Sequence, residues 1–342
     1  MTYYRNTWYV AAWGHEIDGG LSHRVILDDD ILLFRDEAGR PGAVANMCPH
    51  RFAPLHLGRK VGGNVECGYH GLQFDSTGAC VHNPHGNGGI PSACRVKSYP
   101  VVERHGAVWI WPGDPERADA ATVPDFGHLA ASTNKTVFGS TLVQANYQLI
   151  NDNLMDASHT QYVHSDHLGS DAFRRSDHQV LAEGGTISSN YVLPSGPIPA
   201  AYRLYFDDPD QPVIYSASFR WYPASLVRNT ISITPVEPSE QPGIQRIGSH
   251  FMTPESPTST HYFFAHTRSF RLDDEAIDEQ IRRWQKTGLA GQDGTMLEAV
   301  QRVMGTRDLD SMHPALLSID PAAVRVRQAL KRLMRQSEPA MA

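Results

Sequence analysis

Two short segments of this chain each place one cysteine and one histidine almost side by side. One residue separates Cys48 from His50, two residues separate Cys67 from His70, and sixteen residues lie between the two pairs. Each segment therefore offers one ligand of each kind, so that two loops can clamp a metal centre from opposite sides. This feature constrains the fold most, because the two loops must approach each other closely.

A two-iron, two-sulfur cluster of the Rieske type needs two thiolates on one iron and two imidazoles on the other. The four residues supply that set of ligands. A zinc site is the alternative, but zinc sites usually pair cysteine with cysteine and histidine with histidine. The mixed pairs favour the Rieske cluster. Cys80 and Cys94 have no histidine at a matching spacing, and we expect them to be small, partly buried residues.

The fold class predicted from the sequence is α+β. With 342 residues, the chain has room for about two domains. We expect an all-β domain over residues 1–118, which carries the cluster, and a catalytic domain over residues 119–342. Strands of the first domain are predicted from apolar or alternating runs at 8–12, 24–27, 31–34 and 107–111.

The second domain is predicted to combine an antiparallel sheet with helices gathered on one side. Its strand-like runs lie at 188–193, 213–221, 230–234 and 261–266. Residues 144–164 are expected to be helical over part of their length, and 273–284 to form a helix with acidic residues in its first turn. A last helix is predicted to start at Pro321, with Asp320 as N-cap, and to continue to about residue 334.

Composition excludes several classes of function. The formal net charge is −7, and no long basic run is present, so nucleic acid is not an expected partner. The first twenty residues do not have the pattern of a signal peptide, and no run of about 18 apolar residues predicts a membrane span. We therefore expect a cytoplasmic protein.

A second group of ligand-type residues lies between 151 and 164. His159 and His164 can supply two corners of a facial triad, with a distant carboxylate as the third. On a straight helix they would sit about 140° apart, so the helix must loosen or end between them, for example at a π-like bulge. Asp156 precedes His159 by three residues, where its carboxylate could accept a hydrogen bond from the imidazole or bridge to a cluster histidine.

These residues together resemble the Rieske non-haem iron oxygenases, and among them the aromatic O-demethylase oxygenases of the vanillate and dicamba type. The likeness covers nearly the whole chain. It rests on the segments at 5–12, 48–55, 67–72, 81–88 and 152–159. The expected catalytic fold is that of the helix-grip, or START-like, domains.

The resemblance implies a role for individual residues. Cys48, His50, Cys67 and His70 would hold the cluster, and His159 and His164 the mononuclear iron. The third iron ligand would be a late acidic residue after a Trp-Gln pair, which is Asp293, with Glu298 as the second choice. Further residues carried over from the family are Asn153 near the iron, Asp156 as the bridge between centres, and Asn229, His250 and Trp284 in the substrate pocket.

The implied reaction is the oxidation of a methoxy-substituted, vanillate-like aromatic acid by dioxygen, which releases formaldehyde and a phenol. No glycine-rich dinucleotide fingerprint follows a strand, so electrons from NAD(P)H would arrive through a separate reductase or ferredoxin. The family also implies a head-to-tail homotrimer. Other readings are a Rieske monooxygenase that hydroxylates a ring or methyl carbon or removes an N-methyl group, a pure electron carrier, and a zinc-binding interaction module.

Overall fold

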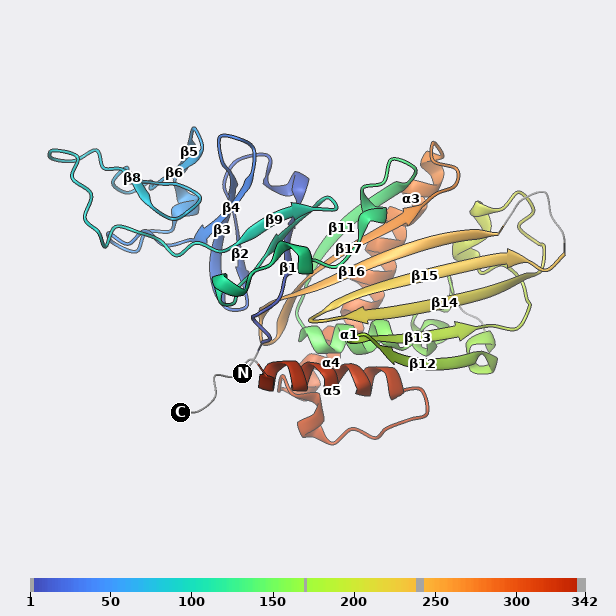
Figure 1. The fold of residues 1–342 in the computed structure, drawn as a ribbon. Coiled ribbons are helices and arrows are strands. Elements are labelled where there is room, and N and C mark those ends of the chain that lie inside the picture. The colour runs from blue at the N-terminus through green and yellow to red at the C-terminus, as the bar shows by residue number, and fades with distance from the viewer. Residues whose placement is uncertain (1–2, 169–170, 238–242, 337–342) are drawn as a thin grey trace. The chain divides into compact units, whose positions relative to one another are not determined.

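The computed structural model describes residues 3–168, 171–237 and 243–336 (Figure 1). The chain divides into two compact units, one formed by Tyr3–Asp125 and the other essentially by the chain from Phe126 onward. Within the described ranges, no helix is both long enough and apolar enough to cross a bilayer.

The N-terminal unit is a β structure built from three small antiparallel sheets, as the sequence predicted. Its sheets have the strand orders β2-β3-β4, β1-β10-β9 and β5-β6-β7-β8. The ten strands are β1 (Tyr9–Trp13), β2 (Ser22–Ile26), β3 (Asp29–Arg35), β4 (Pro41–Ala45), β5 (Arg59–Val61), β6 (Asn64–Glu66), β7 (Gln73–Phe74), β8 (Cys80–His82), β9 (Val101–Arg104) and β10 (Ala107–Ile110). Two loops carry the Cys/His pairs: one follows β4, and the other joins β6 to β7.

The segment after residue 118, the predicted domain boundary, packs on the N-terminal unit. The indole N–H of Trp8 donates to the carbonyl of Asp119 at 2.9 Å, and the Arg104 guanidinium donates to the carbonyl of Ala120 at 2.9 Å. These contacts explain why the division between the units falls at Asp125 rather than at residue 118.

The C-terminal unit contains a seven-stranded antiparallel sheet with the order β11-β17-β16-β15-β14-β13-β12. Its strands are β11 (Lys135–Val143), β12 (Asp177–Glu183), β13 (Thr186–Val192), β14 (Val213–Tyr222), β15 (Leu226–Pro235), β16 (Ile244–Ser256) and β17 (Ser259–Arg268). Consecutive strands pair from β12 to β17, and β11 joins at the far edge beside β17.

Helices cover one face of this sheet, which confirms the predicted α+β class. They are α1 (Tyr147–Met155), α2 (Thr160–Val163), α3 (Glu275–Trp284), α4 (Gly294–Met304) and α5 (Pro321–Gln336). Helix α1 packs against β14 and β16, α3 against β11, and α5 against α1 and β13. Helix α5 begins at Pro321 as predicted, and α3 begins at Glu275 after its N-cap Asp274.

The period-two alternation of strand residues places a set of polar side chains on the helix-facing side of the sheet. Asn229 of β15 lies opposite Gly248 of β16, and Gly248 lies opposite His266 of β17. Arg246 and His250 are two residues to either side of Gly248 and therefore share its face. The floor of the candidate catalytic site is built from these alternate positions.

Candidate metal centres

The two Cys/His loops of the N-terminal unit repeat one backbone design. The Cys48 N–H donates to the Ala53 carbonyl at 2.9 Å, and the Cys67 N–H donates to the Leu72 carbonyl at 2.8 Å. Four residues after each cysteine, a backbone N–H donates back to that cysteine's carbonyl, from Phe52 at 2.9 Å and from Gly71 at 3.0 Å. Each ligand loop is therefore closed at both ends by backbone hydrogen bonds.

The same turn position has a left-handed backbone in both loops. Gly71 has φ of +72°, which glycine adopts without steric cost, and Phe52 has φ of +59°. The turn in each loop brings its Cys and His side chains to the same end of the unit.

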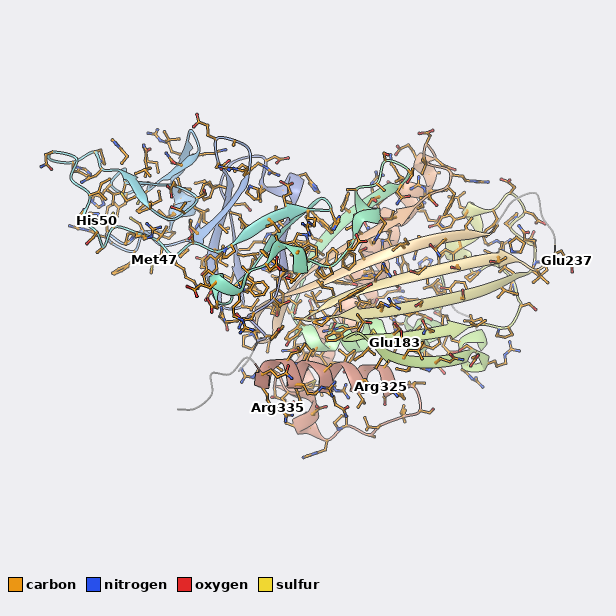
Figure 2. All side chains as sticks on the ribbon, viewed as in Figure 1. Met47, His50, Glu183, Glu237, Arg325 and Arg335 are labelled. Atoms are coloured by element: carbon orange, nitrogen blue, oxygen red, sulfur yellow. The ribbon has the colours of Figure 1, made fainter. Side chains whose placement is uncertain are left out.

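The fold sorts the four ligands by kind, although the sequence mixes them. Cys48 and Cys67 are buried, and their thiols lie next to each other. The rings of His50 and His70 are also neighbours, with centroids 4.5 Å apart. His50 is exposed, on a loop that also carries the exposed Met47 (Figure 2). Two thiols on one side and two imidazoles on the other fit a Rieske cluster, in which each iron takes one kind of ligand.

The surroundings of the thiols fit a metal as well. Burial, together with the adjacent Cys67 thiol, raises the pKa of Cys48 to about 11. The thiolate form therefore needs a cation close by, which iron would supply. Cys80 and Cys94 are partly buried against the same core, as expected. The ring of His85 donates to the His70 carbonyl at 2.8 Å and so supports the second loop.

In the C-terminal unit, the two candidate iron-binding histidines do not lie on one straight helix. Helix α1 stops at Met155, and Asp156 adopts an extended backbone. The Asp156 carboxylate then accepts a hydrogen bond from the Ser158 N–H at 2.8 Å and starts a short 3₁₀ helix (Ala157–His159). Asp156 is thus a new N-cap ahead of both histidines. Helix α2 follows and stops at Val163, and the backbone of His164 is no longer helical. The break expected between His159 and His164 is therefore the end of α2, not the π-like bulge offered as an example.

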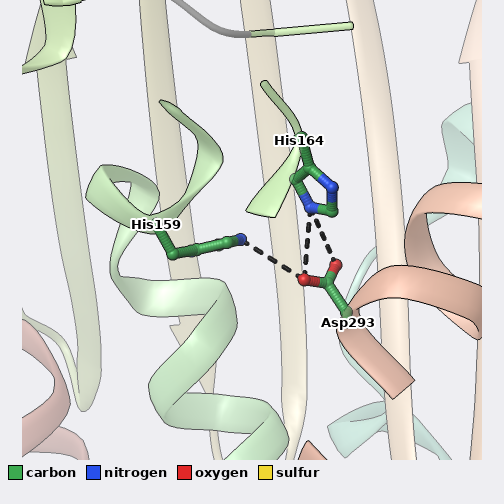
Figure 3. Close-up of side chains that lie close together, drawn as sticks. All are labelled: His159, His164 and Asp293. Carbon is green, nitrogen blue, oxygen red and sulfur yellow. Dashed lines mark hydrogen bonds and ion pairs between the residues drawn. The ribbon is translucent and has the colours of Figure 1, made fainter. Parts of the chain in front are cut away.

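The structure brings His159, His164 and Asp293 together (Figure 3). One ligand atom from each residue lies within 4.8 Å of the other two. Nε2 of His159 is 3.5 Å from Oδ1 of Asp293, and Nε2 of His164 is 3.2 Å from the same atom. Two imidazoles and one carboxylate at this spacing match the donor set of a facial triad, which leaves positions open for dioxygen and solvent.

Hydrogen bonds to the other ring nitrogens orient both imidazoles. Nδ1 of His159 donates to the Asp156 backbone carbonyl at 2.5 Å, and Nδ1 of His164 donates to Oε1 of Gln292 at 2.8 Å. Because both acceptors are carbonyl oxygens, each Nδ1 carries a proton, and Nε2 is the nitrogen that would bind a metal beside Asp293. Backbone or amide acceptors of this kind fix the orientation of metal-binding histidines.

Asp293 comes from a π-helix (Gln285–Asp293) that lies between α3 and α4. The Asn153 amide donates to Oδ1 of Asp293 at 3.3 Å, which places this predicted residue beside the carboxylate. Burial disfavours the charge on His164, but the hydrogen bond to Asp293, the charge of Asp293 and the hydrogen bond to Gln292 together outweigh it and raise the pKa of His164. The alternative acid, Glu298, lies elsewhere and accepts a hydrogen bond from the Gln144 N–H at 3.1 Å.

One predicted contact of Asp156 is wrong. Its carboxylate does not accept a hydrogen bond from His159, because it is already engaged with the N–H and hydroxyl of Ser158. The Asp156 backbone carbonyl makes the contact to His159 instead. The sequence pattern Asp-x-Ser, which favours an N-cap, was the signal for this arrangement.

The predicted pocket residues line the same cavity as the triad. Asn229, His250 and Trp284 all border it, and the Trp284 ring packs edge-on to His164 with centroids 4.8 Å apart. A Cβ at Gly248 would lie 1.8 Å from Oδ1 of Asn229 and 3.0 Å from Nε2 of His250. Glycine is therefore required at residue 248, since it lets these two polar groups approach each other.

His250 is held neutral in this cavity. Burial, helped by the charge of Arg246, lowers the pKa of His250 to about 3, and its Nδ1 lies 2.6 Å from the Tyr262 hydroxyl. Nε2 of His250 and Oδ1 of Asn229 are buried and have no hydrogen-bond partner in the described part of the chain. Polar atoms in this state are unusual in folded proteins and point to a ligand.

Sequence reasoning missed three residues of this site: Gln292, Arg246 and His266. Gln292 orients His164, while Arg246 and His266 line the cavity. Arg246 lies two residues before His250 on β16, and His266 of β17 lies opposite Gly248. Their side chains face the same cavity as His250. Period-two counting from His250 would have found Arg246, but only if β16 had been recognised as a strand.

Two family models match the chain. The Vanillate O-demethylase oxygenase C-terminal domain matches residues 143–336, and the Rieske [2Fe-2S] domain matches residues 7–100. Together they account for both units.

Full-length relatives match as well. The dicamba O-demethylase oxygenase component of Stenotrophomonas maltophilia is 41% identical over 97% of this chain and 98% of its own. The chloroacetanilide N-alkylformylase oxygenase component of Rhizorhabdus wittichii is 38% identical over 96% of this chain and 94% of its own. A crystal structure of dicamba monooxygenase with non-heme iron and dicamba superposes with a TM-score of 0.86, at 38% identity and 98% coverage of both chains.

Proposed function

Because the chain belongs to the vanillate and dicamba O-demethylase branch of the Rieske non-haem iron oxygenases, we propose that it is the oxygenase component of an aromatic O-demethylase. Its substrate is a methoxy-substituted aromatic acid of the vanillate kind, and its products are formaldehyde and a phenol. The observation that carries this proposal is the His159–His164–Asp293 group, with His164 and Asp293 buried, at the wall of a cavity that Asn229, two further histidines and a tryptophan also line.

When bound, the cluster supplies electrons one at a time and the mononuclear iron supplies the activation of dioxygen. The chain's own residues orient the metal ligands and shield the site from water. The Asp156 carbonyl and Gln292 hold the imidazoles, and Asn153 holds Asp293. Trp284 packs against His164 and helps to exclude water from that side.

The chain acts with a separate electron donor. Its relatives are named as oxygenase components, and such components work with a reductase or a ferredoxin. We place the donor's contact near His50 and His70, because these imidazoles lie at the surface while the thiols are buried. A cytoplasmic location, where NAD(P)H is available to a reductase, forms part of the proposal.

The proposal includes a homotrimer in which the cluster of one subunit serves the iron of its neighbour. Asp156 is the bridging carboxylate in this arrangement. Support comes from its position, since its carbonyl holds His159 while its half-buried carboxylate points away from the imidazole to Ser158. Equilibrium sedimentation of the purified protein tests the trimer directly.

The experiment for the reaction is a screen of methoxylated benzoates. Purified protein loaded with iron and sulfide is supplied with a surrogate reductase, and formaldehyde and phenolic acid are measured. The proposal expects equal amounts of the two products from at least one methoxybenzoate. A cis-diol, or a ring-hydroxylated product that retains the methoxy group, would contradict it.

N-Dealkylation is the second candidate, and the similarity to the N-alkylformylase component favours it over ring hydroxylation. The two reactions differ in the group that is left behind. N-Dealkylation leaves an amine or amide N–H, whereas O-demethylation leaves a phenol. The same screen, extended to N-alkyl anilides, therefore separates them.

A further inference from the structure

Arg246 is a buried cation on the floor of the proposed catalytic cavity. It lies on β16, and only 6% of the residue is exposed. It borders the same cavity as His159, His164 and Asp293. In the part of the chain that the structure describes, no carboxylate forms an ion pair with its guanidinium.

The hydrogen bonds of Arg246 leave its charge uncompensated. The guanidinium donates to the Tyr202 hydroxyl at 3.2 Å and lies 4.9 Å from the centre of that ring, and the Arg246 side chain also hydrogen-bonds to Tyr205. Its Nε is buried and has no hydrogen-bond partner among the residues that the structure describes. Burial raises the pKa of Tyr205 and, much further, that of Tyr215, so these neighbours stay neutral phenols. An isolated buried charge is costly, and an anion in contact with it removes much of that cost.

Other unpartnered polar atoms lie on the same face of the sheet. Arg246, Gly248 and His250 are alternate residues of β16, and Asn229 stands opposite Gly248. Nε of Arg246, Nε2 of His250 and Oδ1 of Asn229 all lack partners within the described ranges. Three orphaned polar groups bordering one cavity indicate a ligand that satisfies them together.

Arg246 borders two neighbouring cavities. The cavity beside the triad measures about 60 Å³, and a neighbouring cavity of about 330 Å³ is also bordered by Arg246 and Trp284. The inner space holds only a few water molecules, so an aromatic ring enters by moving the side chains between them.

We propose that Arg246 is the residue that selects an anionic substrate, by donating hydrogen bonds to the carboxylate of the aromatic acid. This inference rests on the proposed function and deepens it. Guanidinium pairs with carboxylate through parallel N–H donors, so it fixes the direction of the acid as well as its charge. His250 and Asn229 then contact the remaining polar groups of the ligand, and the methoxy carbon is presented to the triad.

The test compares vanillate with its neutral amide, vanillamide, in equilibrium binding to iron-loaded protein. In wild type we expect vanillate to bind at least about 10-fold more tightly than vanillamide. In Arg246→Met the affinity for vanillate should fall by about 10- to 100-fold, while that for vanillamide changes by less than about 3-fold. Arg228→Met is the matched control, because Arg228 is a half-buried arginine on the opposite face of β15.

Equal losses for both ligands in Arg246→Met, or an unchanged affinity for vanillate, would overturn the proposal. Thermal unfolding and cluster absorbance show whether Arg246→Met folds. If it does not fold, the wild-type protein alone tests the proposal, and equal wild-type affinities for vanillate and vanillamide would overturn it. Formaldehyde release is measured in parallel. Wild type that binds vanillate tightly but releases no formaldehyde would refute the O-demethylase function and leave the anion site standing.

Discussion

At the scale of single residues, the Asn153 amide holds the carboxylate of Asp293, the acidic member of the triad. Its donation to Asp293 at 3.3 Å is a contact of the kind that orients a metal ligand from outside. We expect Asn153→Ala to weaken the affinity for the mononuclear iron by about 10-fold. Chelator competition measures this loss, and unchanged cluster absorbance in the same sample is the internal control. Wild-type iron affinity in the variant would contradict the assigned role.

His250 gives a pH dependence of stability whose sign follows from its pKa. In the folded protein burial lowers that pKa to about 3, whereas an unfolded chain has an ordinary histidine near 6.5. The unfolded state therefore binds the proton more readily, and the stability associated with neutral His250 is complete above pH 6.5 and is lost as the pH falls from there toward 3. We expect His250→Gln to flatten this loss in urea titrations between pH 7.5 and 4.5. A wild-type slope in the variant would contradict this.

Residue spacing explains which ligands were predictable. The Cys/His pairs are close in sequence, so their chemistry could be read without a fold. Asp293 is one of 37 acidic residues and was selected only by resemblance, because a ligand supplied from another helix leaves no local pattern. Arg246 had no signal of its own, since the cost of its burial depends on the strands around it.

At the scale of elements, the π-helix from Gln285 to Asp293 positions Trp284 and Asp293 on one cavity. Its Gly288 is in contact with the Trp284 ring, and a Cβ there would lie 2.6 Å from the nearest ring carbon. Gly288→Ala should therefore displace the indole, cost about 1–3 kcal/mol of stability and raise KM for the aromatic acid. Urea unfolding and steady-state kinetics measure the two effects.

The matched control for this element is Gly294→Ala. A Cβ at Gly294 meets its nearest atom at an ordinary 3.6 Å. Because alanine favours helix over glycine, the control should be neutral or slightly stabilising. If both variants behave alike, steric contact with Trp284 is not what Gly288 provides.

Some element boundaries in the C-terminal unit could be predicted from the sequence, and others could not. The need for a break between His159 and His164 followed from helical geometry alone, and the structure confirms a break. The break is the end of α2 at Val163 and not the π-like bulge offered as an example, whereas the actual π-helix lies beyond Trp284. A π-helix depends on its packing against neighbouring elements, here α3, α4 and β11. No residue pattern in 285–293 predicts it.

At the scale of the whole molecule, the proposed trimer makes Asp156 the link between a cluster and an iron on different subunits. Asparagine also caps helices well, so Asp156→Asn keeps the start of the 3₁₀ helix. We expect this variant to load both centres and to accept electrons at the cluster, but to release formaldehyde at least about 10-fold more slowly with the reductase. A wild-type rate of formaldehyde release by Asp156→Asn would contradict the role of Asp156 as the bridge between the centres.

The central claim is that two separate iron centres, one in each unit, are held by different sets of residues. Metal and sulfide analysis combined with low-temperature paramagnetic resonance of the dithionite-reduced protein tests it most directly, with wild type and His164→Ala measured side by side. We predict about three irons and about two sulfides per wild-type chain, and in the variant the loss of about one iron with the reduced-cluster signal intact. Zinc in place of iron, or a cluster signal that disappears with His164, would contradict the account.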